Sequence, residues 1–160
     1  MIQQLTVKLP NRPGSLERAL AALAAANVDL RALAVSDRGP DHGEASMIVS
    51  DLDSARTALT DYELLVHEVV VVAVDDRVGG LAAILEVLAA REVNIAQLYA
   101  FVSRHQTKAL AVLRVDGDPA DAARLLADAG FSVIGGVAGA DARPTGPKPL
   151  DEHSGLDFIW

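Results

Sequence analysis

Apolar and polar positions along the first half of the chain follow two periods in turn. Residues 5–9, Leu-Thr-Val-Lys-Leu, alternate strictly, which is the pattern of a strand with one buried face. Leu16, Leu20 and Leu23 recur at spacings of four and three, which places them on one face of a helix. The other elements predicted in this half are strands at 28–36, 44–50 and 63–67 and a helix within "DLDSARTAL".

The second half repeats this order at a constant offset of 65 residues. Residues 6–37 align without a gap on 71–102, and the identical pairs include Arg12 with Arg77, Gly14 with Gly79, Leu16 with Leu81, Leu20 with Leu85, Leu23 with Leu88 and Val28 with Val93. Helices rich in Ala and Leu inflate such identities, but a constant offset over this span indicates a tandem duplication. The elements expected here are strands at 69–74, 93–103, 108–115 and 131–137, the helix of Leu81, Leu85 and Leu88, and a helix that Asp118 caps and Pro119 begins. Asn27 and Glu92 are expected to end the first helix of each unit.

Each unit therefore reads β-α-β-β-α-β, the order of a ferredoxin-like α+β fold with an antiparallel sheet and helices on one face. The expected domains are residues 1–67 and 68–138, and a flexible C-terminal tail is predicted over 139–160. The stretch "ELLVHEVVVVAV" leaves no room for a linker between the units, so they are expected to lie rigidly beside each other.

Composition narrows the functional classes. The chain is 51% apolar but only 4% aromatic, so its core must be built from Ala, Val, Leu and Ile. With 22 acidic and 14 basic residues the formal charge is −8, which argues against nucleic acid as a partner. No apolar run approaches the roughly 20 residues that span a bilayer, and there is no cysteine. We expect a cytoplasmic protein without a membrane partner, cofactor or bound metal.

The loops "NRPGSL" and "DRVGGL", each followed one helix later by "NVDL" or "VNIAQL", resemble the ACT domain, a small-molecule-binding regulatory module of amino-acid metabolism. The resemblance extends to about residue 138. It implies that ACT units pair, often side by side into a continuous eight-stranded sheet, and bind an amino acid where the units meet. It also implies that the loop before the first helix of one unit faces the turn before the second strand of its neighbour.

The resemblance places the ligand-binding residues in two loops and two turns. They are Asn11, Arg12, Gly14, Ser15 and Leu16 with the facing turn Asn94 and Ile95, and Asp76, Arg77, Gly79, Gly80 and Leu81 with the facing turn Asp29 and Leu30. A helix N-terminus offers free N–H groups and a partial positive charge to a carboxylate, and glycine lets a ligand approach them. The alternative is that the glycines only permit a tight turn, with Asn11 and Asp76 as helix caps.

The two loops differ in charge. The first loop has Asn11 and Arg12 and would face Asn94, whereas the second has Asp75 and Asp76 and would face Asp29. Because carboxylates repel a ligand carboxylate, the first site is expected to bind an amino acid more tightly. The same residues could instead meet between two chains of a homodimer.

Other groups of residues give weaker evidence for a functional site. The four histidines, His42, His67, His105 and His153, are scattered, and Asp41, His42 and Glu44 are better explained as a solvated turn than as a metal site. We identify no set of catalytic residues and no dinucleotide or Walker motif. Tyr99 and Phe101 are expected in the core or between sheets, with Tyr99 lining the ligand pocket as the alternative. The terminal "LDFIW" could dock on the sheet's open face or on a partner.

The leading hypothesis is a non-catalytic sensor or regulatory subunit that binds an amino acid and acts on a separate metabolic enzyme. Two other classes stay open. One is a small enzyme on a ferredoxin-like fold, which would need a catalytic set that the sequence does not show. The other is a structural assembly module whose ligand sites are vestigial, as Asp29, Asp76 and Val78 would suggest.

Overall fold

A computed structural model describes residues 1–102 and 108–135. Both predicted units are present, in the predicted order of elements. The first comprises β1 (Ile2–Pro10), α1 (Ser15–Ala25), β2 (Leu30–Asp37), β3 (His42–Val49), α2 (Leu52–Ala58) and the first part of β4 (Glu63–Asp75). The second comprises the rest of β4, α3 (Gly80–Ala89), β5 (Ile95–Val102), β6 (Lys108–Val115), α4 (Pro119–Asp128) and β7 (Ser132–Ile134). The predicted α+β fold class is confirmed.

A single antiparallel sheet runs through both units in the order β2-β3-β1-β4-β6-β5, and β7 also pairs with β4. β4 joins the units because it serves each of them in turn. It pairs with β1 from Glu63 to Val69, and from Val70 onward it pairs with β6. The sheet is continuous, as expected, but its described residues form seven strands rather than eight, since β4 takes two strand positions. The predicted boundary between residues 67 and 68 falls inside β4.

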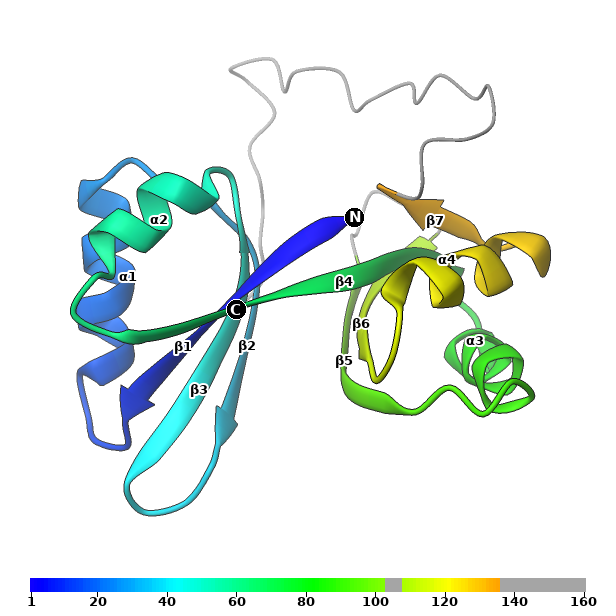
Figure 1. The fold of residues 1–160 in the computed structure, drawn as a ribbon, viewed down its shortest axis with the longest axis horizontal. Helices are drawn as coiled ribbons and strands as arrows, with labels where there is room; N and C mark the ends of the chain where they lie inside the picture. Colours follow the sequence, from blue (N-terminus) through cyan, green and yellow to red (C-terminus); the bar gives the residue numbers. More distant parts are fainter. Residues whose placement is uncertain (103–107, 136–160) are drawn as a thin grey trace.

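The sheet curls so that its helix-free faces pack against each other. Figure 1 shows α1 and α2 on one outer side, α3 and α4 on the other, and β4 passing between the two groups of strands. Val69, Val71 and Val112 are buried on this inner face, with Tyr99 packed against them. Within one chain the units are therefore paired face to face as well as through β4.

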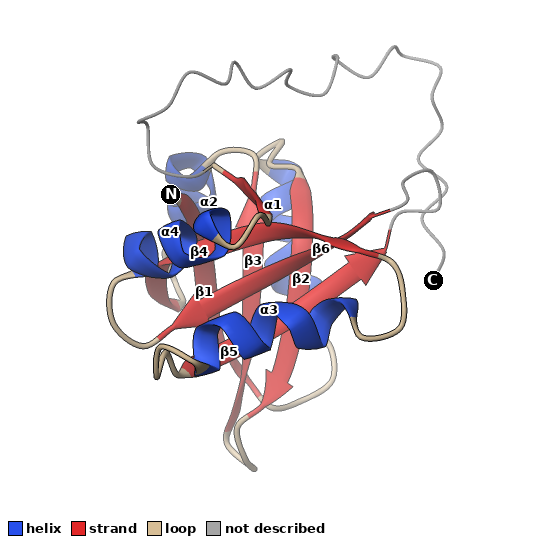
Figure 2. Cartoon of the chain, turned by 90° about the vertical axis from the view of Figure 1, so that its right-hand side faces the viewer, coloured by secondary structure: helices blue, strands red, loops and turns tan. Residues whose placement is uncertain are grey.

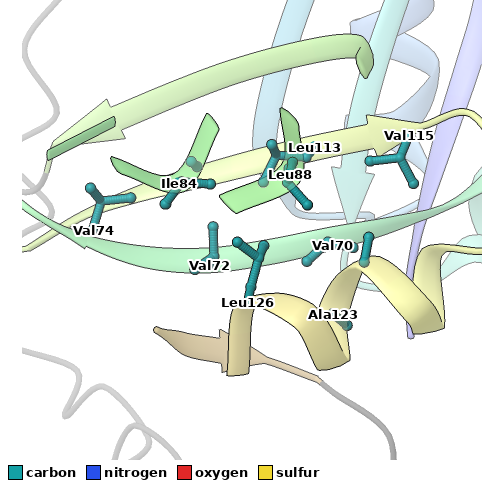
Figure 3. Close-up of a cluster of buried hydrophobic side chains, with 11 residues drawn as sticks. Val70, Val72, Val74, Ile84, Leu88, Leu113, Val115, Ala123 and Leu126 are labelled. Carbon is teal, nitrogen blue, oxygen red and sulfur yellow. The ribbon is translucent and has the colours of Figure 1, made fainter. Parts of the chain in front are cut away.

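Each unit has its own core between its helices and its part of the sheet. In the second unit, side chains of β4, β6, α3 and α4 converge, as Ile84, Leu88, Leu113 and Leu126 show in Figure 3, where they point toward one another. These four side chains are fully buried. In the view of Figure 2, α3 and α4 lie in front of the strands and cover that face. The aliphatic core is the one that the low aromatic content predicts.

The first helix of each unit ends as its sequence predicts. Asn27 and Glu92, both just beyond the helix, have φ of 55°, the left-handed conformation that terminates helices. The second helices begin on side-chain caps. Asp51 accepts from the Ser54 N–H, and Asp118 accepts from the Ala120 N–H at 2.9 Å. Ser54 donates to the Asp51 carboxylate through both its N–H and its hydroxyl, and these hydrogen bonds lower the pKa of Asp51. None of the helices in the described residues is long and apolar enough to cross a membrane.

Candidate functional site

The two predicted loops have the same backbone geometry. Each first helix is preceded by a glycine in the left-handed conformation, Gly14 with φ 81° and Gly79 with φ 82°. Neither α1 nor α3 has a side-chain cap, in contrast to α2 and α4 with their aspartates. Asn11 and Asp76 are therefore not helix caps, and this part of the alternative is wrong. The first N–H of each helix donates within its own loop, from Ser15 to the Arg12 carbonyl at 3.2 Å and from Gly80 to the Arg77 carbonyl at 3.0 Å. The N–H groups that follow have no side-chain cap and are the ones that could meet an anion.

The first loop is fastened to the β2–β3 turn of its own unit. Asn11 donates through Nδ2 to the carbonyl of Gly39 at 2.8 Å and to Asp37 Oδ1 at 3.2 Å. Both hydrogens of the Asn11 side-chain amide are therefore used within the unit. The Asn11 Oδ1 is an acceptor and could receive a hydrogen bond from the α-ammonium group of a ligand. Asp37 adds a negative charge beside this loop that the sequence analysis did not place there.

The second loop is partly neutralised by cations. Asp75 lies 3.9 Å from Arg77 Nε and 3.9 Å from Lys108 Nζ. All three side chains are exposed, so these ion pairs contribute little to stability, but they reduce the negative charge of the loop. Gly80 is buried at the start of α3. The charge difference between the loops is therefore smaller than their sequences suggest.

The two predicted turns are also held within their own units. The backbone of Asp29 bonds with Ser50, whose side chain accepts from the Asp29 N–H at 2.9 Å. Asn94 donates from Nδ2 to Asp116 Oδ2 at 2.6 Å. Among the described residues, no hydrogen bond or ion pair joins either loop to the turn of the other unit. The folded chain thus holds the two loops and the two turns apart from one another, and the structure pairs no loop with the turn of the other unit.

A layer of polar side chains joins the two units on the inner face of the sheet. Gln4, which is fully buried, donates to Gln97 Oε1 at 3.0 Å, and the Tyr99 hydroxyl donates to Gln4 Oε1 at 3.1 Å. Thr6 and Ser46 share a further buried hydrogen bond. Burial raises the pKa of Tyr99 to about 12. Tyr99 thus lies on the inner face of the sheet, between the two units. This agrees with the first of its two predicted positions, in the core or between sheets.

His67 on β4 and Arg114 on β6 form a further contact between the units, which the sequence alone did not predict. The Arg114 Nη1 lies 3.3 Å from His67 Nε2. Burial, and then the charge of Arg114, lower the pKa of His67, while Glu44 acts in the opposite direction. The imidazole is therefore neutral and accepts at Nε2 from the guanidinium. An arginine on an inward-facing strand position was the signal that could have identified this pair.

Two cavities open along the part of β4 that β6 does not cover. One, of about 660 Å³, lies beside α2 and is lined by residues that include Arg56, Tyr62 and Leu65. The other, of about 470 Å³, lies where β4 and β6 separate and is lined in part by His67 and Arg114. None of the predicted loop or turn residues lines either cavity.

The remaining expectations concern metals and the C-terminus. His42 and Glu44 lie on β3, and the described residues contain no group of three or more metal-ligating side chains. His105, His153 and the "LDFIW" segment lie outside the described residues, as does the tail predicted over 139–160.

Comparison with solved structures finds the same fold in bacterial proteins. Protein BT0572 from Bacteroides thetaiotaomicron is 29% identical, with a TM-score of 0.76 over 83% of this chain and 91% of that one. The regulatory subunit of aspartate kinase from Thermus thermophilus, in its ligand-free form, is 17% identical, with a TM-score of 0.61 over 80% of this chain and 91% of that one. The regulatory subunit of aspartate kinase from Thermus flavus is 16% identical, with a TM-score of 0.55 over 81% of this chain and 94% of that one.

No curated protein matches the chain. The family model described as "ACT domain pair", however, matches residues 1–134, which includes every described helix and strand. The duplicated loops, the two βαββαβ units and this match agree, and the chain belongs to the ACT domain pair family.

Proposed function

We propose that this chain is a non-catalytic regulatory protein that binds a free amino acid at interfaces between ACT units and thereby modulates a separate enzyme of amino-acid metabolism. One observation carries the proposal. The first helix of each unit follows a left-handed glycine and lacks a side-chain cap, whereas the second helix of each unit has one. The uncapped N–H groups that follow Ser15 and Gly80, at equivalent places in both units, suit the carboxylate of an amino acid.

The regulatory role follows by analogy. The Thermus proteins of the same fold are described as regulatory subunits of aspartate kinase. At 16–17% identity they support the fold, and a comparable role for this chain is our proposal. Binding would favour one arrangement of the units and so shift the activity of the partner enzyme.

A homodimer would complete the sites. β2 and β5 are the outermost strands of the sheet, and each begins directly after one of the predicted turns. Val35 on β2 is 56% exposed and Phe101 on β5 is 39% exposed, so both edges present apolar side chains. Unpaired strand edges are ready templates for another chain. We therefore infer that a second copy, and not the same chain, brings a turn to face each loop.

A thermal-shift screen of the twenty amino acids tests the function. At a concentration near 100 times Kd, the bound amino acid should raise the melting temperature by about 5–10 °C. Gly79→Ala should weaken binding at the second loop about tenfold, because a Cβ would stand where the ligand approaches the N-terminus of α3. Gly130→Ala is the matched control, since Gly130 has φ 89° and open space around it, as Gly79 has. The proposal fails if no amino acid shifts the melting temperature.

Unequal sites give a second prediction. We expect Asn94→Ala to weaken binding more than Asp29→Ala, because the loop opposite Asn94 holds Arg12 whereas the loop opposite Asp29 holds Asp76. Titration calorimetry on both variants measures the difference. Equal losses of affinity would show that the ion pairs of Asp75 and the proximity of Asp37 to Asn11 cancel the charge difference.

A further inference from the structure

The cavity between β4 and β6 takes side chains from both units. His67 and Glu68 come from the part of β4 that pairs with β1, while Arg114 and Asp116 come from the end of β6 and the turn beyond it. Its volume of about 470 Å³ lies in the range of small-molecule sites. It is present in a single chain and needs no second copy.

Arg114 gives this cavity an unneutralised positive charge. Every other arginine in the described ranges is exposed, and Arg114 alone is half-buried. Its one hydrogen bond goes to the neutral His67, and its Nε is buried without a partner among the described residues. No described carboxylate lies within ion-pair distance of it, in a chain whose formal charge is −8. A guanidinium has five donors in a planar fork that matches a carboxylate.

The rest of the lining is acidic and apolar. Glu68 and Asp116 are exposed carboxylates at the cavity, and Asp116 uses Oδ2 for Asn94. One cation and two carboxylates fit a ligand that carries both charges better than a simple anion such as phosphate. Val66, which is 39% exposed, also lines the cavity and offers an apolar surface to a side chain.

We propose that this cavity binds a free aliphatic amino acid, with its carboxylate on Arg114 and its ammonium group on Glu68 or Asp116. The inference rests on the proposed function for its class of ligand. It assigns a different site, one that a single chain forms. Because His67 and Glu68 belong to one unit and Arg114 to the other, the ligand would fasten the junction between them. The Asn94–Asp116 hydrogen bond links this site to one of the predicted turns.

The experiment is titration calorimetry with L-alanine, L-valine, L-leucine and L-isoleucine on the whole chain. At least one should bind, and its amide and its N-acetyl derivative should bind at least tenfold more weakly, since each loses a hydrogen bond between charged groups. Arg114→Gln should reduce affinity at least tenfold by the same reasoning. Arg124→Gln, which changes an exposed arginine on α4, is the matched control. The double variant Gly14→Ala, Gly79→Ala should still bind through this cavity.

Several outcomes would overturn the inference. If none of the four amino acids binds, the cavity site is rejected, while other amino acids could still occupy the loops. If Arg114→Gln leaves binding intact and the double glycine variant abolishes it, the cavity is rejected and the proposed loop sites stand. Should Arg114→Gln fail to fold, Arg114→Lys and Glu68→Gln replace it. Arg114→Lys loses the planar fork but keeps the charge, and unchanged affinity in both variants would equally reject the site.

Discussion

Replacing Gly80 by serine is expected to lower the free energy of unfolding by about 3 kcal/mol, although the first unit has serine at the equivalent position. A Cβ on Gly80 would lie 2.3 Å from the carbonyl oxygen of Asp75 and 3.2 Å from Val74 Cγ1. The Asp75 carbonyl cannot move freely, because it accepts from the Arg77 N–H at 2.8 Å and Asp75 pairs with Lys108 in the sheet. Either β4 or α3 must therefore shift.

Chemical denaturation of Gly80→Ser and of the reciprocal Ser15→Gly variant measures this effect. Ser15 is 4% exposed and fits its loop, so Ser15→Gly should cost only about 1 kcal/mol, mainly through the greater backbone freedom of glycine. If the two variants lose equal stability, or Gly80→Ser is neutral, the two loops are sterically equivalent and the proposed crowding is wrong. Loops that share a motif and a glycine conformation would then also be interchangeable as ligand sites.

Hydrophobic periodicity predicted the elements because each unit folds largely on local patterns. Leu16, Leu20 and Leu23 indicated α1 correctly, and Asp118 with Pro119 identified the start of α4. Asn27 indicated the end of α1, because asparagine tolerates the left-handed conformation. These features depend on residues close together in sequence, so a single sequence contains them.

The arrangement of the units could not be predicted in the same way. Gln4 alternates with Leu5 on β1, and such a polar position normally faces solvent. In the structure its partners Gln97 and Tyr99 lie more than ninety positions away, on a strand of the other unit. The cavity around Arg114 depends on the same packing. The loops were predicted from their motif, but which turn faces which loop depends on contacts that no local pattern specifies.

Replacing Gln97 by leucine is expected to lower the free energy of unfolding by about 2 kcal/mol. The Gln4 side chain is fully buried, and its amide nitrogen would be left with only the 3.4 Å contact to Thr6. Leaving a buried donor without a partner costs its full desolvation energy. Gln3→Leu, at an exposed position of β1 beside Gln4, is the matched control and should change stability by less than about 0.5 kcal/mol.

A double-mutant cycle shows whether this contact couples the units. Gln4→Leu alone leaves Gln97 and Tyr99 without a partner, but both are only partly buried and can reach water. Removing both glutamines replaces a polar contact by an apolar one, so the double variant should be more stable than the sum of the single effects predicts, by about 1 kcal/mol. Denaturation of the four proteins gives this coupling energy directly.

The coupling energy bears on regulation, because a ligand bound at one unit can influence the other only through contacts that the two share. Besides β4 itself, the described contacts of this kind include the inner apolar cluster, the hydrogen bonds of Gln4 and the hydrogen bond between His67 and Arg114. Hydrogen bonds depend on direction more strongly than apolar contacts, so a small rotation of one unit relative to the other would break the hydrogen bonds of Gln4. If the two substitutions act additively, Gln4 and Gln97 do not couple the units, and β4, the apolar cluster and the His67–Arg114 contact would have to transmit the effect of a ligand.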